Sequence, residues 1–154
     1  MTKAIFGKIG RNLATETMAK DLFHYAVRQA LLKEQWVITA DPLIIKIEGV
    51  KLEIDLAAEK VFAAEKAGRK IAVEIKSFLN PSTITDFHTA LGQFLNYRLA
   101  LQIREPNRTL YLAVPIDTFE SFFQEIFIQE AVKLYQVKLA IYNPIEEIIT
   151  TWKE

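Results

Sequence analysis

Glu74 and Lys76 lie two residues apart in a short apolar segment, residues 70–78. Side chains two residues apart in an extended chain project from the same face of a sheet, so this carboxylate and this ammonium are expected to point the same way. Asp55 lies in a second segment of alternating apolar residues, 50–56. If the two segments are neighbouring strands, two carboxylates can hold a divalent cation with a lysine beside it. That arrangement is typical of metal-dependent phosphodiester cleavage.

The available ligands favour magnesium over zinc. The chain has no cysteine and two histidines, which does not indicate a zinc site. Mg²⁺ prefers oxygen ligands and is usually held by one or two carboxylates, with water and phosphate oxygens completing its shell. We therefore expect Mg²⁺, or Mn²⁺ in its place, to bind Asp55, Glu74 and the backbone carbonyl of Ile75. In this interpretation Lys76 positions a water molecule and screens the charge on the phosphate.

The same residues also fit an ordinary strand. Glu74 and Lys76 alternate with Val73 and Ile75, as they would in a strand with one solvated face. The pattern alone therefore leaves open whether Glu74 serves a site or faces water. A fully solvated Glu74 would favour a role without catalysis.

The composition predicts one domain over residues 1–154. The chain is 51% hydrophobic and long enough to bury a core. It has no apolar run of about 18 residues, as a membrane helix needs, and no apolar signal-peptide region. The lack of cysteine fits a cytoplasmic location. Basic and acidic residues number 19 each, which argues against a strong non-specific nucleic-acid binder.

The elements that would position these residues alternate between helices and strands. Amphipathic spacing predicts helices over 15–35, over 82–102 and from Asp117 onward. Apolar alternation predicts strands over residues 36–39, 43–47, 50–56, 70–78, 109–114 and 137–142. Residues 56–67 are ambiguous, since their composition favours a helix and a hairpin turning near Gly68 serves equally well. The order of elements predicts a mixed α/β sheet with helices on its faces.

The spacing of Asp55, Glu74 and Lys76 resembles the Asp…Glu-x-Lys motif of the PD-(D/E)xK nuclease superfamily. Gln93 and Tyr97, one helical turn apart, resemble the Gln-x-x-x-Tyr signature of several of its members. The whole chain resembles more specifically the fdxN element excision-controlling factor H (XisH-like) family of small cyanobacterial proteins. The phrases that carry this resemblance lie at residues 19–24, 36–42, 72–78 and 90–94.

The resemblance implies a restriction-endonuclease-like core, with a mixed central sheet flanked by helices, and it favours the hairpin over 56–67. It also implies a role in DNA excision by a site-specific recombinase. DNA and an excision-controlling factor I type (XisI-like) protein are the expected partners. Gln93 joins Asp55, Glu74 and Lys76 in the implied catalytic set. Because related folds also serve as binding modules, two functions stay open: a Mg²⁺-dependent DNA endonuclease, and a non-catalytic assembly or DNA-binding subunit.

Three further polar residues are accessory candidates for the site. The resemblance assigns an acid of the first helix to the metal, for which Asp21 is the candidate. His24 lies three residues later on the same helix face, where it either joins the site or packs the helix. Tyr97, with Gln93, either belongs to the site or forms a buried hydrogen-bonded pair. Four phenylalanines form either core or the interface of a homo-oligomer: Phe119, Phe122, Phe123 and Phe127.

Overall fold

The computed structural model describes residues 13–60 and 68–154, with side chains described from Met18 onward. The chain forms, in order, α2 (Leu13–Lys33), β1 (Val37–Ala40), β2 (Leu43–Ile47), β3 (Val50–Ile54), β4 (Leu56–Lys60), β5 (Arg69–Ile75), α3 (Thr83–Arg104), β6 (Arg108–Pro115), α4 (Ile116–Glu120), the 3₁₀ helix η1 (Phe122–Gln124), α5 (Ile126–Leu134), β7 (Leu139–Asn143) and β8 (Ile148–Lys153). No helix within these residues is both long and apolar enough to cross a membrane.

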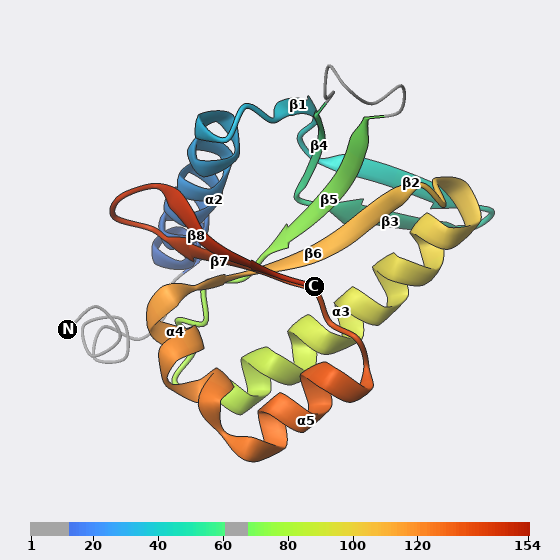
Figure 1. The fold of residues 1–154 in the computed structure, drawn as a ribbon. Helices are drawn as coiled ribbons and strands as arrows, with labels where there is room; N and C mark the ends of the chain where they lie inside the picture. Colours follow the sequence, from blue (N-terminus) through green and yellow to red (C-terminus); the bar gives the residue numbers. More distant parts are fainter. Residues whose placement is uncertain (1–12, 61–67) are drawn as a thin grey trace.

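Six of the strands form one twisted sheet in the order β1-β4-β5-β6-β7-β8 (Figure 1). The central pairs β5–β6 and β6–β7 are parallel, and the outer pairs are antiparallel. Strands β2 and β3 pair with each other as a separate antiparallel hairpin. The predicted mixed α/β sheet with helices on its faces is therefore confirmed.

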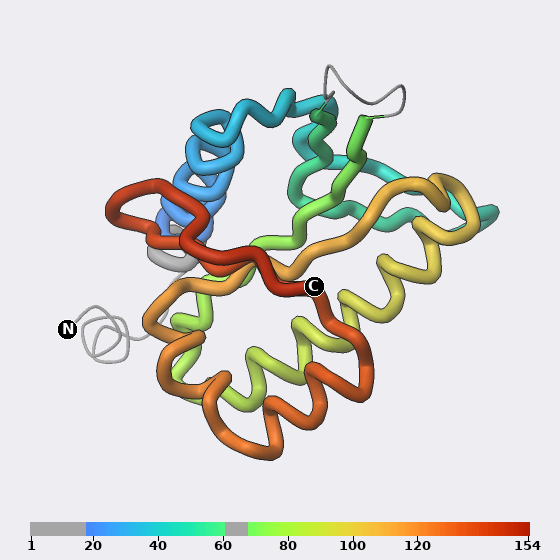
Figure 2. The backbone as a smooth tube through the Cα atoms, in the orientation of Figure 1, coloured from blue at the N-terminus to red at the C-terminus, as the bar shows by residue number. Residues whose placement is uncertain are grey.

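Helices cover both faces of the sheet (Figure 2). On one face, Val27 and Leu31 of α2 pack in a core cluster with apolar residues of β4, β5, β6 and β7. On the other face, α3, η1, α5 and the β2–β3 hairpin enclose a second cluster around Phe94. Strand β5 alternates between the two clusters, since Val73 faces α2 and Ala72 faces α3. Glu74 is two residues from Ala72 and so projects to the α3 face.

The ambiguous segment after Leu56 begins as a strand. Strand β4 pairs antiparallel with β5, in register Leu56↔Val73 and Glu59↔Lys70. The hairpin interpretation is therefore correct for the strands, while the predicted turn falls largely on residues 61–67, outside the described residues. The predicted strand 50–56 was wrong in one respect: β3 ends at Ile54 and β4 starts in the other sheet, so Asp55 occupies a bend between them.

The C-terminal third differs more from the sequence prediction. The predicted third helix is interrupted after Glu120, where the Ser121 hydroxyl donates to the carbonyl of Asp117 at 2.8 Å. Hydroxyls that bond the backbone in this way compete with a continuing helix. Asp117 lies in the first turn of α4 and does not cap it, because the N-cap position is Pro115. Strand β8 was not predicted, since its exposed and half-buried residues do not alternate strictly.

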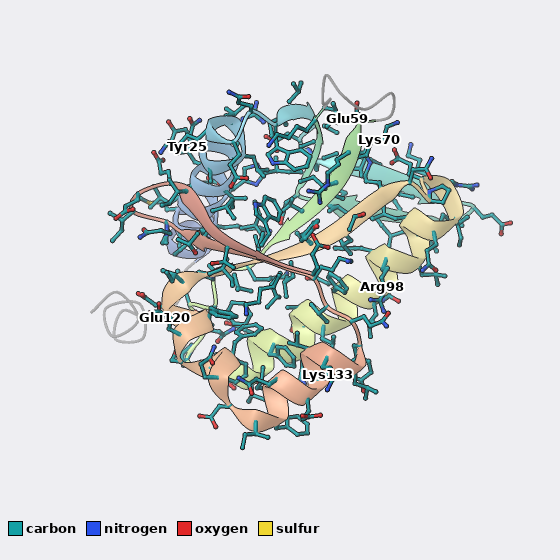
Figure 3. All side chains as sticks on the ribbon, viewed as in Figure 1. Tyr25, Glu59, Lys70, Arg98, Glu120 and Lys133 are labelled. Carbon is teal, nitrogen blue, oxygen red and sulfur yellow. The ribbon has the colours of Figure 1, made fainter. Side chains whose placement is uncertain are left out.

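Helix α2 presents several large apolar side chains to solvent. Met18, Leu22 and Tyr25 are 67%, 68% and 54% exposed, whereas Ala26 and Ala30 are buried. Figure 3 labels Tyr25 on the outer side of the helix. The helix is correctly predicted, and its buried side contributes Val27 and Leu31 to the core cluster with the sheet.

Candidate functional site

Asp55 and Glu74 meet where β4 and β5 pair. Because Leu56 is in register with Val73, the residue before β4 lies beside the residue after Val73. The backbone N–H of Asp55 donates to Oε1 of Glu74 at 3.3 Å, and the backbone N–H of Ile75 donates to Oδ2 of Asp55 at 2.7 Å. These reciprocal bonds fix the two carboxylates next to each other.

The Glu74 carboxyl group is buried, with 5% of the residue exposed, so the solvated-strand interpretation of this residue is wrong. The pKa of Glu74 is raised from 4.5 to about 7, first by burial and then by the neighbouring Asp55 carboxylate, while the Lys76 ammonium acts against both. The Lys76 ammonium therefore does not fully offset the effects of burial and of Asp55 on the Glu74 carboxylate. A bound cation would stabilise the ionised form of both acids.

Lys76 points to the same side as Glu74. Its Nζ lies 3.3 Å from Oε2 of Glu74 and donates to Oε1 of Gln93 on α3. The backbone is also held, since the Tyr142 hydroxyl of β7 donates to the Lys76 carbonyl at 3.0 Å. The structure thus brings together Asp55, Glu74, Lys76 and Gln93.

Tyr97 lies one helical turn after Gln93 on α3 and is half-buried. Its pKa is raised to about 12, first by burial and then by the negative charges of Glu74, Asp55 and Glu53. The hydroxyl therefore stays protonated near neutral pH. The Tyr97 hydroxyl is close enough to Asp55 and Glu74 for their charges to affect its pKa, and the Tyr97 ring packs against the α3-side core.

The donor set fits magnesium. Among residues 18–60 and 68–154, no group of three or more His, Cys, Asp and Glu side chains forms a metal cage. Two adjacent carboxylates and the carbonyl of Ile75 nevertheless match the few protein ligands that Mg²⁺ usually takes, with water for the rest. Asp55 and Glu74 would hold the ion, and the observation in its favour is that the two carboxylates lie next to each other, with Glu74 buried.

A pocket of about 320 Å³ opens beside these residues, at the carboxyl end of β5. Asp55, Ile75 and Lys76 line it from the sheet, and Lys20 and His24 line it from α2. The structure does not bring Asp21 to this pocket, because its side chain is exposed and does not belong to the lining.

The four phenylalanines divide between core and surface. Phe123 is buried, and Phe119 and Phe122 pack against the α3-side core. Phe127 is 72% exposed. The break after Glu120 explains this split, since one continuous helix would have placed the four on a shared face.

Two residues of the site region were not predicted from the sequence. Tyr142 precedes Asn143 at the carboxyl end of β7, and residues at the carboxyl ends of adjacent parallel strands meet at one edge of a sheet. That rule would have found it. Asp41, which contacts His24, gave no comparable signal, because it lies in the loop between β1 and β2.

Comparisons with known proteins give a consistent family. A family model described as "XisH protein" matches residues 17–150. An XisH family protein from Nostoc punctiforme has a crystal structure that matches with a TM-score of 0.78 and 50% sequence identity, over 86% of this chain and 99% of that chain. An fdxN element excision controlling factor protein from Anabaena variabilis matches with a TM-score of 0.79 and 50% identity, over 87% of this chain and 99% of that one. No curated protein matches the sequence. The chain therefore belongs to the XisH family.

Proposed function

We propose that this protein is a Mg²⁺- or Mn²⁺-dependent DNA endonuclease with a restriction-endonuclease-like core, acting in the control of DNA excision. The observation that carries the proposal is the adjacent pair of Asp55 and the buried Glu74, with Lys76 beside it at the carboxyl end of β5. The name of the Anabaena variabilis relative, an excision controlling factor, supports a DNA substrate.

Each residue has a distinct role in this proposal. Asp55 and Glu74 would hold the ion, which would supply a water of lowered pKa and stabilise charge on the phosphate. Lys76, which pairs with Glu74 here, would donate to the attacking water or to a phosphate oxygen. Gln93 on α3 accepts a hydrogen bond from the Lys76 ammonium and so holds it beside Glu74. Tyr142 fixes the backbone from which Lys76 projects.

The proposed partners, DNA and other proteins of DNA excision, are suggested by the family and by the net charge of the chain. The chain carries 19 basic and 19 acidic residues, so its net charge gives little attraction to DNA. An excision-controlling factor I type (XisI-like) protein would supply the missing positive surface, and a site-specific recombinase would act on the same DNA. We expect the isolated protein to bind duplex DNA weakly and to lose it as salt rises.

A non-catalytic assembly subunit is the second candidate. The exposed apolar side chains of α2 favour it, since Met18, Leu22, Tyr25 and Leu32 are each more than 40% exposed. Such side chains on one helix face are typical of a surface that another protein covers. In this case the nuclease-like core would serve as a scaffold.

A cleavage assay separates the two candidates. Supercoiled and branched DNA are incubated with the protein and Mg²⁺ or Mn²⁺, with and without the factor I type partner. The nuclease proposal expects metal-dependent nicking that Lys76→Ala removes. Lys70→Ala is the matched control, because Lys70 lies at the opposite end of β5 and pairs with Glu59 (Figure 3). If no condition yields nicking and a partner complex forms equally well with Lys76→Ala, the assembly role stands.

A further inference from the structure

The ring of His24 is held in a fixed orientation on the wall of the pocket. Its Nε2 lies 2.8 Å from Oδ1 of Asp41. The other oxygen of Asp41, Oδ2, accepts from NH1 of Arg28 at 2.6 Å. A carboxylate bound to one ring nitrogen sets the ring orientation and leaves the other nitrogen, Nδ1, for a further partner. The ring of His24 is therefore held in one orientation by Asp41, and its side chain, 29% exposed, remains accessible to a ligand.

Lys20 lies one helical turn before His24 and lines the same pocket. Its side chain is exposed, and within the described part of the chain no ion pair or hydrogen bond is found for it. The helix itself is firmly placed, since Val27 and Leu31 pack into the core cluster that includes Ile75. Lys20 and His24 thus stand on a rigid wall of the pocket that Asp55 and Lys76 also line.

The remaining lining suits an oxyanion with several acceptor oxygens. Six side chains that can donate hydrogen bonds line the pocket: Lys20, His24, Lys76, Ser77, Asn80 and Thr89. Two carboxylates, Asp55 and Asp86, line it as well. Oδ2 of Asp86 accepts the backbone N–H of Asn80 at 3.0 Å, which partly satisfies that acid. A phosphodiester offers acceptor oxygens for such donors and carries one negative charge.

We propose that His24, oriented by Asp41, and Lys20 form a phosphate-binding subsite that holds a phosphodiester of the nucleic-acid strand from the α2 side. The identity of the ligand as a nucleic acid rests on the proposed function, whereas the affinity for a phosphodiester does not. His24 and Lys20 are positioning residues in this proposal. They place the nucleic-acid strand beside Asp55 and Lys76, which line the same pocket, and take no part in metal binding.

The two histidines of the chain allow a direct test by NMR. His88 is exposed on α3 and is not among the lining residues, so it serves as an internal control. The imidazole signals of the full-length protein are assigned with His88→Gln and followed while a thymidine dinucleotide is added without metal. The proposal expects the His24 signals to move and those of His88 to stay. A dinucleotide with an uncharged methylphosphonate linkage should move neither. Equal movement of both histidines, or movement of neither, would overturn the subsite.

Substitutions at Asp41 test the orienting role. Asp41→Asn keeps an oxygen that accepts the Nε2 proton, so it should retain most of the dinucleotide affinity. Lys20→Gln should weaken binding by about tenfold, since it removes a charge-assisted contact to the phosphodiester. Asp41→Ala should weaken binding to a similar extent, since it leaves the His24 ring without the acceptor that orients it. Equal affinity for wild type and both of these variants, with folding verified by melting curves, would contradict the proposal.

The outcome is independent of whether the protein cleaves DNA. If the dinucleotide moves the His24 signals and Glu74→Gln leaves that shift intact, the subsite stands, even where no nicking is seen. If nicking depends on Lys76, while the dinucleotide leaves the His24 signals of the wild type in place and His24→Gln leaves KM unchanged, the endonuclease stands and the subsite falls. Where both hold, His24→Gln should raise KM about tenfold with a smaller change in kcat, as expected for lost ground-state binding.

Discussion

Asp55 donates its backbone N–H to the Glu74 carboxylate at 3.3 Å, although Asp55 lies in the bend before β4 and Glu74, 19 positions later, lies on β5. The Asp55 carboxylate in turn accepts the N–H of Ile75. The bend at Asp55 therefore does more than link two sheets. It sets the half-buried Asp55 beside the buried Glu74, and from this follow the pH and metal responses expected of the protein.

The first prediction concerns stability without metal. Folding raises the pKa of Glu74 from 4.5 to about 7. Between these values the folded state holds a proton that the unfolded chain has released, so this stabilisation is complete below pH 4.5 and is lost as pH rises through 7. We expect Glu74→Gln to raise the free energy of unfolding at about pH 8 by roughly 2–3 kcal/mol. Near pH 4.5 the variant and the wild type should be similar.

Urea unfolding in the presence of a chelator measures this difference at both pH values. Glu53→Gln is the control, because the Glu53 side chain is 53% exposed on β3. The control should show no gain at high pH. A Glu74→Gln variant with the same pH dependence as the wild type would contradict the raised pKa.

The second prediction concerns metal binding. Mg²⁺ or Mn²⁺ should raise the melting temperature, since a ligand bound only by the folded state stabilises it. The increase should be larger at about pH 8 than at about pH 6, because below pH 7 a proton on Glu74 competes with the ion. Differential scanning fluorimetry at both pH values gives the measurement. Glu74→Gln should abolish the shift, and an undiminished shift in that variant would place the metal elsewhere.

The third prediction concerns the link between Lys76 and α3. Gln93→Leu removes the acceptor of the Lys76 ammonium and leaves this half-buried charge with Glu74 alone. We expect a loss of stability of about 1–2 kcal/mol and, if the protein is a nuclease, slower metal-dependent nicking. Gln102→Leu on the same helix is the control, because Gln102 is exposed. Similar losses for the two variants would show that the contact to Lys76 has no special weight.

The fourth prediction concerns a buried charge far from the site. The Arg108 side chain is 5% exposed and bonds Glu59, Glu105 and the carbonyl of Ile71. Arg108→Met strips these acceptors of their donor, which should cost about 3 kcal/mol. Arg104→Met, at the exposed end of α3, should cost less than about 1 kcal/mol. Chemical unfolding of both variants measures the contrast, and equal costs would mean that the Arg108 network adds nothing.

The fifth prediction tests which side of α2 faces the sheet. Leu31 is fully buried, and Leu22 is 68% exposed. Leu31→Ala should lower the free energy of unfolding by about 2–5 kcal/mol, whereas Leu22→Ala should change it by less than about 0.5 kcal/mol. Urea titration of the two variants gives the comparison. A large loss for Leu22→Ala at protein concentrations that favour oligomers, absent on dilution, would indicate that the exposed face is covered in an assembly.

Much of the fold was predictable because its signals are local. Hydrophobic periodicity indicated α2, α3 and the central strands, and Ser82, whose side chain accepts from the N–H of Thr85, is an N-cap of the expected kind. The same local patterns did not predict the break in the third helix after Glu120 or the half-exposed strand β8. The predicted third helix breaks at Ser121, and β8 pairs antiparallel with β7 at the edge of the sheet.

The sequence by itself determined the chemical types of the candidate site and their spacing: a Glu-x-Lys pair and an acid in a preceding apolar segment. Only the tertiary structure decided that Glu74 is buried and not solvated, that Gln93 reaches Lys76, and that Asp41 orients His24 while Asp21 stays outside. The physical reason is that alternation fixes which face of a strand a side chain occupies. What covers that face depends on helices and loops distant in sequence, whose packing no local pattern specifies.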